Sequence, residues 1–445
     1  MIYCTFIVLP NNNPTSNFSS PLKDTKTHPF PPTNLSHLAF ALLGSEKAWH
    51  HRKPYIESWW RPGSTRGLLL LDTQPAGDLL PWSPASPPYR VSRNLTDFVQ
   101  RTKARAPVMI RMVHGIMEAF AELDDDENLR WLVMGDDDSV FLVDNIVDVL
   151  AGYDHTKYYY IGGQSEFIMS NYWFSFNQGF GGAGFMLSYP LAKALAKDME
   201  NCLTRHAGLS SADTITMACV ADVGVNLSPH KGIHQIDLHG DISGFLSSHP
   251  KSPLISLHHF DMVDPIFPTM DRFESTRHLM KAAAADQSRM LQQTICYHRP
   301  SNWSFSISWG YSAHIYEKIE ARSYLQNPIE TFQTWSSTPR PRPHYMFNTR
   351  LPSNGSCEAP HVFFFQRVKK GAAGILTTYS RAAARGLPPC WSGGHTADSV
   401  SEIRVLSPVT KRKEMDRCEC CDIVRVAGAK AELKFRECLI DEIIA

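Results

Sequence analysis

The chain has 445 residues and a mass of 50.1 kDa, which is enough for one large domain or two ordinary ones. Hydrophobic residues make up 43% of the sequence and charged residues 20%, so a globular core is expected. The 44 Lys and Arg residues balance the 44 Asp and Glu residues, so no global field attracts nucleic acid or an anionic membrane. We therefore expect a globular protein that binds no nucleic acid.

Cysteines and N-glycosylation sequons together favour the lumen of the secretory pathway. The ten cysteines are too few for a disulfide-built miniprotein, but they exceed what a reducing compartment usually favours. Cys202 and Cys219 flank one short segment and are the predicted disulfide pair. The late cluster of Cys418, Cys420, Cys421 and Cys438 lacks the spacing of a standard zinc site, so disulfides are preferred there too. Sequons occur at Asn17, Asn34, Asn94, Asn302 and Asn354, with a sixth at Asn226 weakened by Pro229.

The N-terminal segment shows no membrane span. Residues 1–10 are apolar but too short to cross a bilayer, and no basic region precedes them. Any attachment to a membrane therefore requires an anchor that is absent from this chain. Residues 11–35 are rich in Asn, Pro, Ser and Thr, so we expect residues 1–35 to form a disordered arm.

Strand and helix signals alternate from residue 36 onward. Residues 36–44 form a short apolar run closed by Gly44, which predicts a buried strand. Residues 46–60 carry apolar or aromatic side chains at a helical spacing, and residues 66–72 predict a second strand. This order predicts a parallel βαβ unit.

The alternation continues past a Pro-rich loop. Residues 107–123 predict a second helix, and residues 130–134 form a continuous apolar strand of the kind found in sheets covered on both faces. A further helix is predicted with Asp144 as its N-cap, followed by a strand over residues 158–161. From about residue 340 the helical period disappears, which predicts a β-rich or irregular C-terminal part.

Three consecutive acids follow the apolar strand at 130–134. Because ligands bind outside the carboxyl ends of strands in open α/β sheets, Asp136, Asp137 and Asp138 lie where a site is expected. In an extended segment Asp136 and Asp138 point the same way and Asp137 points oppositely. A divalent metal with a bound diphosphate would relieve the repulsion among them. The alternative is a solvated acidic turn in which Asp138 caps a helix, and the position after a buried strand favours the metal site.

A pair of histidines follows another apolar stretch. His258 and His259 offer imidazole nitrogens to Mn or Zn from a different element of the chain. The alternative is a partly buried pair bonded to backbone, and only partnership with the three acids favours the ligand interpretation.

A glycine-rich run at residues 179–184 matches G-x-G-x-x-G but lacks the strand before it and the helix opening on its last glycine. A dinucleotide fingerprint is therefore rejected, and the helix is expected to begin near Pro190. Gly181 and Gly182 instead predict a turn or a close approach to a ligand. The adjacent aromatic residues Tyr172, Trp173 and Phe174 offer surfaces for stacking on a sugar ring, although core packing is the preferred interpretation of each.

Asp213 is the candidate general base. A transfer that inverts an anomeric carbon needs one carboxylate to accept the proton of the acceptor hydroxyl. Asp213 precedes an apolar helix over residues 215–220, so an N-cap role is the preferred alternative on sequence alone.

These motifs resemble the plant branch of the fringe-like glycosyltransferases, the family 31 β-1,3 class that is often described only as a domain of unknown function. The resemblance extends in order over most of residues 35–421, whereas residues 422–445 have no recognised counterpart. The segments that carry it include Trp131–Phe141, Tyr158–Gly162, Gly181–Phe185, Ser188–Leu195 and Ser256–His259.

The resemblance implies a GT-A-like fold, which is an open mixed α/β sheet with helices on both faces, here with a β-rich C-terminal part. It implies residues 36–335 as the glycosyltransferase domain, 336–421 as a β-rich extension and 422–445 as a divergent tail. It also implies Golgi residence and an inverting hexosyl- or N-acetylhexosaminyltransferase. The donor would be a UDP-sugar, and the acceptor a hydroxyl of a glycan, glycoprotein or small molecule.

The resemblance also assigns roles to the candidate residues. It implies Mn²⁺ bound by Asp136, Asp138 and His259, with His258 adjacent, and places Asp136, Asp137, Gly181 and Gly182 at the nucleotide. Asp213 is the implied base, but Thr214 stands where the family often has a second acid. The rival hypotheses are a catalytically inactive UDP-sugar- or glycan-binding protein on the same fold, and a metal-dependent phosphohydrolase, which would usually need a second metal cluster.

Overall fold

The computed structural model describes residues 31–124, 128–337, 341–391, 396–414 and 416–444. The chain divides into two units, Met1–Pro32 and Thr33–Ala445, and the account below is of the second. The predicted arm at residues 1–35 falls largely outside the described residues, as do Cys4 and the sequon at Asn17.

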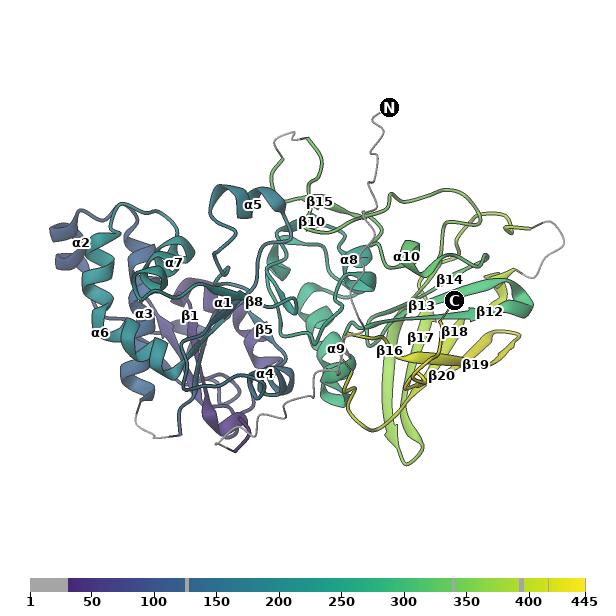
Figure 1. Ribbon diagram of the computed structural model, residues 1–445, viewed down its shortest axis with the longest axis horizontal. Helices are drawn as coiled ribbons and strands as arrows, with labels where there is room; N and C mark the ends of the chain where they lie inside the picture. The colour runs from purple at the N-terminus through teal and green to yellow at the C-terminus, as the bar shows by residue number, and fades with distance from the viewer. Residues whose placement is uncertain (1–30, 125–127, 338–340, 392–395, 415, 445) are drawn as a thin grey trace, which may run out of the picture. The chain divides into compact units, whose positions relative to one another are not determined.

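A seven-stranded mixed sheet forms the N-terminal half of this unit (Figure 1). The predicted βαβ unit is confirmed, because β1 pairs with β2 in parallel across the connecting helix α1. The central strand β4 pairs in parallel with β1 and antiparallel with β7, so the sheet is mixed. In spatial order the strands are β3 (Tyr89–Val91), β2 (Gly67–Leu71), β1 (Leu38–Leu43), β4 (Trp131–Asp136), β7 (Phe185–Ser188), β6 (Tyr160–Gly162) and β8 (Leu227–Pro229).

Helices cover both faces of this sheet, as predicted. Along β1, Leu38, Phe40 and Leu42 pack into one apolar cluster with α1 and α4, whereas Ala39 and Ala41 pack into another with α3, α6 and α7. This alternation is the two-residue period of a strand buried on both faces. The helices are α1 (Glu46–Glu57), α2 (Thr96–Thr102), α3 (Pro107–Leu123), α4 (Val143–Leu150), α5 (Ile168–Trp173), α6 (Tyr189–Arg205), α7 (Ala212–Asp222), α8 (Ser243–Ser248), α9 (Arg272–Ala285) and α10 (Arg322–Leu325).

The predicted cap of α4 is wrong. Leu142 occupies the N-cap position and its carbonyl accepts the backbone N–H of Ile146 at 3.0 Å. Asp144 lies in the first helical turn, where its carboxylate pairs with the Arg61 guanidinium at 2.7 Å. Asp144 therefore forms an ion pair with Arg61 of a distant segment and does not cap the helix.

Two short pairings connect the seven-stranded sheet to the loops beyond its edge. Strand β11 (Ser256–Leu257) lies between β5 (Val140–Phe141), which runs antiparallel to it, and β9 (Ile233–His234), which runs parallel. Strand β10 (Leu238–Gly240) pairs antiparallel with β15 (Phe332–Thr334). The pairings of β11 with β5 and of β10 with β15 join segments more than ninety residues apart in sequence.

An eight-stranded sheet forms the C-terminal part (Figure 1). It begins at Gln293, earlier than the boundary near 336 that the sequence predicted, and it includes residues 420–436, most of which were predicted as a divergent tail. All neighbours in it are antiparallel except β18 and β20. In spatial order its strands are β12 (Gln293–His298), β13 (Trp303–Ser308), β14 (Ser312–Tyr316), β16 (His361–Gly371), β17 (Gly374–Arg381), β18 (Glu402–Ser407), β20 (Lys430–Arg436) and β19 (Cys420–Ala427).

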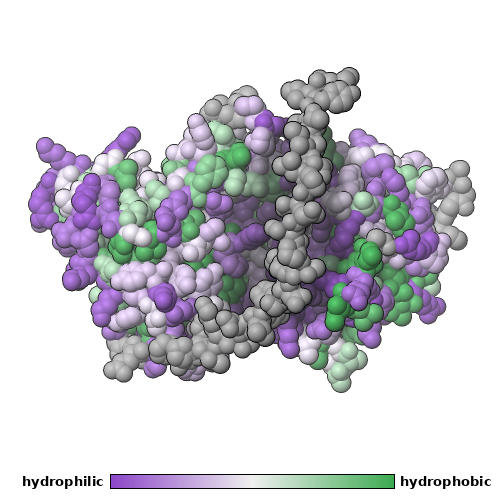
Figure 2. All heavy atoms as spheres, in the orientation of Figure 1, coloured by the Kyte–Doolittle hydropathy of each residue, from purple (hydrophilic) through white to green (hydrophobic). Residues whose placement is uncertain are grey.

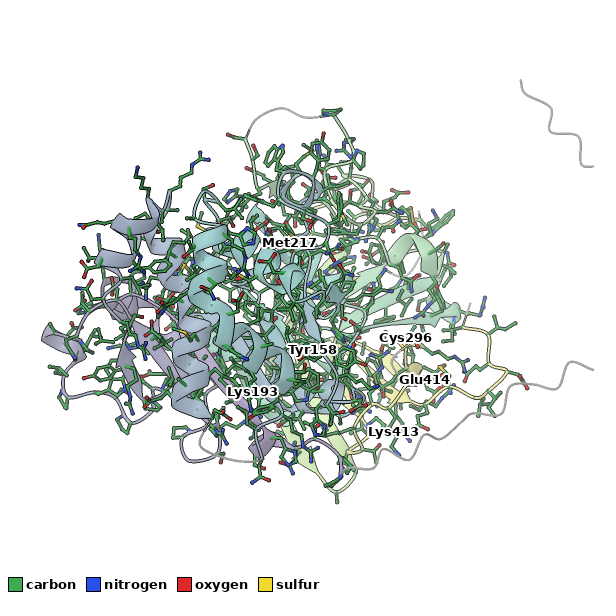
Figure 3. The ribbon with its side chains drawn as sticks, turned by 60° about the vertical axis from the view of Figure 1, so that its left-hand side comes forward. Tyr158, Lys193, Met217, Cys296, Lys413 and Glu414 are labelled. Carbon is green, nitrogen blue, oxygen red and sulfur yellow. A yellow bond between two sulfur atoms is a disulfide. The ribbon has the colours of Figure 1, made fainter. Side chains whose placement is uncertain are left out.

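Four disulfides join described cysteines. The predicted Cys202–Cys219 bond is confirmed and links α6 to α7. The late cysteines also form disulfides, as preferred, and Cys418 keeps a free thiol. Cys296 on β12, labelled in Figure 3, is bonded to Cys421 on β19, so this bond joins the two edge strands of the C-terminal sheet. The remaining bonds are Cys357–Cys390 and Cys420–Cys438.

The surface over the helical layer is polar. Figure 2 shows hydrophilic side chains over α2 and α6. Within the described parts of the chain, none of the helices combines the length and the apolar character that crossing a bilayer requires.

Candidate active site

The three-stranded pairing of β5, β11 and β9 brings the acidic run to the histidine pair. Leu257 pairs with Val140, so the residue after β11, His258, faces the turn that precedes β5. There His258 Nε2 lies 3.1 Å from Asp138 Oδ1, and both side chains are buried. One ligand atom from each of Asp136, Asp138 and His258 lies within 4.8 Å of the others. The histidine brought to the acids is therefore His258.

His259 has different neighbours. Its Nδ1 lies 3.2 Å from Asp237 Oδ1, and its ring stacks on Trp335 with centroids 4.6 Å apart. His259 has φ of +57°, a left-handed conformation that is uncommon for a residue with a Cβ and occurs often at functional sites. This backbone turn explains how two adjacent histidines reach different carboxylates.

Arg52 of α1 brings a positive charge to the acidic run. Its guanidinium donates to Asp137 Oδ1 at 2.7 Å and to Asp261 Oδ2 at 2.9 Å, and it lies 3.4 Å from Asp138 Oδ2. Asp137 also accepts the backbone N–H of Ser45 at 3.3 Å. Asp137 is thus held by the scaffold, on the side of α1.

The two outer acids differ in pKa. Burial alone would raise the pKa of Asp138, but the charge and hydrogen bond of His258, together with Arg52, hold it well below the usual range. Burial raises the pKa of Asp136 to about 7, and the neighbouring Asp138 and Asp137 carboxylates add to the rise. The pKa of His258 rises to about 9, because Asp138 and Asp136 outweigh the effect of burial.

The glycine run fits closely around these side chains. A Cβ at Gly182 would lie 2.1 Å from His258 Cε1, so no larger residue fits there unless the histidine moves. Ser139 Oγ accepts the backbone N–H of Asp136 at 2.7 Å and donates to the Gly182 carbonyl at 2.6 Å. The loop after β4 and the glycine run are therefore fixed to each other.

Asp213 lies at the start of α7 beside the same group. Its Oδ1 accepts the backbone N–H of Gly181 at 2.9 Å, and it lines a small cavity of about 30 Å³ together with Asp136. Ser211, not Asp213, occupies the N-cap position, so the preferred N-cap interpretation is wrong. Burial raises the pKa of Asp213 to about 6, although the Gly181 N–H opposes the rise.

The residue beside Asp213 is engaged elsewhere. Thr214 Oγ1 donates to the Gln178 side chain at 2.9 Å. The position where the family often has an acid therefore contributes no charge to the cavity of Asp136 and Asp213.

The aromatic residues of α5 and the loop after it are exposed, so the core-packing interpretation is wrong for them. Tyr172 is 70% exposed, Trp173 43% and Phe174 47%. They follow the strand β6, and Phe174 packs edge-on against Phe180 of the glycine run at 6.4 Å. An aromatic surface thus adjoins the glycine run.

Two known protein families match this sequence. Residues 170–421 match the family described as "Protein of unknown function, DUF604", which is more than half of the chain. The chain belongs to this family. Residues 90–244 match a second family, described as Fringe-like, and this stretch contains the acidic run and Asp213. No curated protein matches the sequence.

The two matches confirm the resemblance to the fringe-like glycosyltransferases of family 31. The mixed sheet covered on both faces and the β-rich C-terminal part confirm the predicted GT-A-like fold class. The family indicates a glycosyltransferase that uses a nucleotide-sugar donor and a glycan acceptor, and it is compatible with use of a divalent metal.

The residues at the acidic run fit such a metal ion. Among the described residues, Asp138 Oδ2 and His258 Nδ1 are buried without a hydrogen-bond partner. Leaving buried polar atoms without a hydrogen bond is costly, and a metal ion would contact Asp138 Oδ2 more closely than the Arg52 guanidinium does at 3.4 Å. Two carboxylates and an imidazole are a ligand set that suits Mn²⁺.

Sequence reasoning missed three residues of this site. Arg52, Asp237 and Asp261 lie on or beside elements that carry no motif, and each contacts a predicted residue or its partner. The one signal in the sequence was the basic residue Arg52 on the helix that follows β1. Because β1 and β4 are parallel, this helix begins at the same edge of the sheet as the acidic run. That signal is shared by many surface helices.

Proposed function

We propose that the chain is a metal-dependent inverting glycosyltransferase that transfers a sugar from a UDP-sugar to a hydroxyl acceptor, with a β-1,3 linkage. The observation that carries the proposal is the cavity shared by Asp136 and Asp213, next to the Asp138–His258 pair. This cavity is lined by Asp136, a candidate ligand of the metal ion that would bind the leaving UDP. It is also lined by Asp213, the candidate base that would deprotonate the acceptor hydroxyl.

Asp136, Asp138 and His258 would hold Mn²⁺, with His259 as the further ligand that the family resemblance suggests. The ion would neutralise negative charge on the departing diphosphate. Arg52 keeps Asp137 and Asp138 in place through its contacts at 2.7 and 3.4 Å. Gly181 and Gly182 would let the backbone approach the nucleotide closely.

Asp213 would accept the proton of the acceptor hydroxyl. The acceptor oxygen forms a bond to the anomeric carbon, the bond from that carbon to the UDP oxygen breaks, and the proton passes to the carboxylate. With its pKa raised to about 6, Asp213 is largely ionised at neutral pH and close to the range in which a base works best. The exposed Tyr172, Trp173 and Phe174 offer stacking surfaces to an acceptor glycan.

A second candidate function is binding of a nucleotide sugar without transfer. It is favoured by Thr214, which stands where the family often has an acid and donates its hydroxyl hydrogen to Gln178. We also propose residence in the Golgi lumen, supported by the four disulfides and by sequons whose described asparagines are exposed, at Asn34, Asn94, Asn226, Asn302 and Asn354.

The test is a panel of UDP-sugars with Mn²⁺, measured for donor binding and for UDP release. Asp138→Ala is expected to weaken Mn²⁺-dependent UDP binding by at least about 100-fold, because a ligand of the ion is lost. Asp97→Ala, which removes an exposed acid of α2, should bind as the wild type does. Unchanged binding by Asp138→Ala contradicts the metal assignment. Binding without UDP release on addition of any acceptor supports the binding-protein alternative.

A further inference from the structure

A second group of metal-ligand side chains lies outside the acidic run. One ligand atom from each of Glu166, His234 and His249 lies within 4.8 Å of the others. Two more such groups occur among the described residues, at Cys202 and at Cys420, but their cysteines are in disulfides and offer no thiolate. Glu166, His234 and His249 therefore stand out as the second set whose ligand atoms are all available.

Glu166 is a buried carboxylate with little fixed positive charge around it. It is 4% exposed, its Oε2 accepts the backbone N–H of Ile236 at 2.6 Å, and its Oε1 lies 2.9 Å from His234 Nδ1. Within the described ranges, His234 is the one ion-pair partner that the structure gives it. A buried carboxylate is costly unless a cation or several donors compensate its charge.

His234 carries the second observation. The residue is 2% exposed, and its Nδ1 lies 2.9 Å from Glu166 Oε1, so this ring nitrogen faces the carboxylate. A neutral imidazole with its proton on Nε2 keeps a lone pair on Nδ1. An ion between the two groups would therefore bind His234 through Nδ1 and Glu166 through a carboxylate oxygen.

His249 is held in place by aromatic packing. It follows α8 directly, and its ring lies 4.0 Å from Phe347 and 4.8 Å from Phe245, centroid to centroid. The ring of His234 lies 5.5 Å from that of His249. Ligands held on rigid elements need little reordering to bind an ion.

The group opens on a cavity of about 400 Å³. Glu166, His234 and His249 line it, and Lys231 and Lys251 lie at its border with exposed side chains. Zinc sites with three protein ligands keep a further position for water or a ligand, and two histidines with one glutamate are an established set of this kind. The cavity leaves room for that position.

We propose that Glu166, His234 and His249 bind a divalent transition-metal ion, of which Zn²⁺ fits the ligand set best, at a site separate from the acidic run. Such an ion gives the buried carboxylate its counter-charge. His234 pairs with Leu257, the residue before His258, so the ion also fixes the strand pairing on which the active-site histidine depends. The two lysines favour an anionic group as the additional ligand.

The experiment measures zinc bound per chain after equilibration with Zn²⁺ and removal of free metal. Asp138→Asn, which disables the candidate site for Mn²⁺, is expected to retain this zinc, and His249→Ala in the same background to lose it. Gln164→Ala is the matched control, because Gln164 lines the same cavity without an imidazole or carboxylate. Zn²⁺ should raise the Tm of Asp138→Asn by about 3 °C or more and leave that of the double variant unchanged.

Equal zinc content in Asp138→Asn and in the double variant overturns the proposal. If the double variant does not fold, the absorption spectrum of Asp138→Asn loaded with Co²⁺ decides instead. Visible bands of Co²⁺ bound in a site of low coordination number are expected, and their absence overturns the proposal. Because the readouts are metal content and spectrum, the outcome is independent of whether the chain transfers a sugar.

Discussion

Two groups of carboxylates in the described part of this protein differ in how well the protein itself satisfies them. In the C-terminal sheet Glu317 follows β14 and is 2% exposed. It accepts the backbone N–H groups of Cys390 and Ala397, both at 2.8 Å, and lies 3.0 Å from His361 Nε2 and 3.4 Å from Arg385. Burial opposes ionisation, but these hydrogen bonds lower the pKa of Glu317 to about 2.

The acids at the edge of the seven-stranded sheet have fewer donors. Asp136 and Asp213 have pKa values raised to about 7 and about 6, in both cases chiefly by burial. The hydrogen bond that Asp213 receives from the Gly181 backbone only partly offsets this effect. A carboxylate that the fold fully satisfies stabilises the fold, whereas carboxylates buried without enough donors mark a place where a ligand or proton is expected.

The largest effect is expected from removing the candidate base. Asp213→Asn should lower kcat by about 10²- to 10⁴-fold, because the acceptor hydroxyl loses its proton acceptor, while UDP binding stays within about twofold. The measurement is sugar transfer alongside equilibrium binding of UDP. Thr214→Ala is the matched control and should retain most of the rate. A fully active Asp213→Asn variant assigns the base to another group.

The pH profile gives a second readout for Asp213. A base must be ionised to act, and the pKa of this carboxyl is raised to about 6. The transfer rate should therefore fall roughly tenfold for each pH unit below 6 and level off above it. A profile flat down to pH 5 is inconsistent with Asp213 as the base.

Removing the charge of Glu317 should affect stability and not ligand binding. Glu317→Gln is expected to lower the free energy of unfolding by about 3 kcal/mol, since it breaks a buried ion-pair network, and to leave UDP binding unchanged. Denaturant titration measures the loss. Glu432→Gln in β20 of the same sheet, where the side chain is 43% exposed, should change stability by less than about 0.5 kcal/mol.

The lowered pKa of Glu317 also determines how the stability of the fold depends on pH. Because the pKa of Glu317 in the folded state lies below its usual 4.5, its contribution to stability is present above pH 4.5 and is lost as the pH falls towards 2. Glu317→Gln should therefore show a weaker loss of stability over that window than the wild type. Equal acid sensitivity in the two proteins would mean that the fold does not stabilise the ionised form of Glu317.

A smaller effect is expected from the glycine run. Gly182→Ala places a Cβ 2.1 Å from His258 Cε1, so the imidazole must move away from Asp138. Metal-dependent UDP binding should weaken by about 10- to 100-fold. Gly208→Ala is the control, because a Cβ there meets no atom within 4 Å. If both variants bind UDP as the wild type does, the position of His258 is not required for binding.

The sequence by itself determined the features that depend on local pattern. The continuous apolar runs, the helix at Pro107–Leu123 and the acids after β4 determined the α/β class and the edge at which the site lies. The Cys202–Cys219 bond was also predictable, since the two residues are only 17 positions apart. The alternation of apolar residues and Ser in Trp303–Ser308 is a strand signal well before the predicted boundary near residue 336, although the sheet begins earlier still, at Gln293.

Tertiary structure alone decided which of these residues meet. Strands of two residues set the contact between His258 and Asp138, and a shift of one residue in that pairing would turn His259 towards the acids instead. Arg52 reaches the site from 85 residues away, and His249 comes to Glu166 through helix packing. Such contacts follow from register and packing between distant segments, which no local pattern encodes, whereas the strand that delivers the three acids is specified by its own residues.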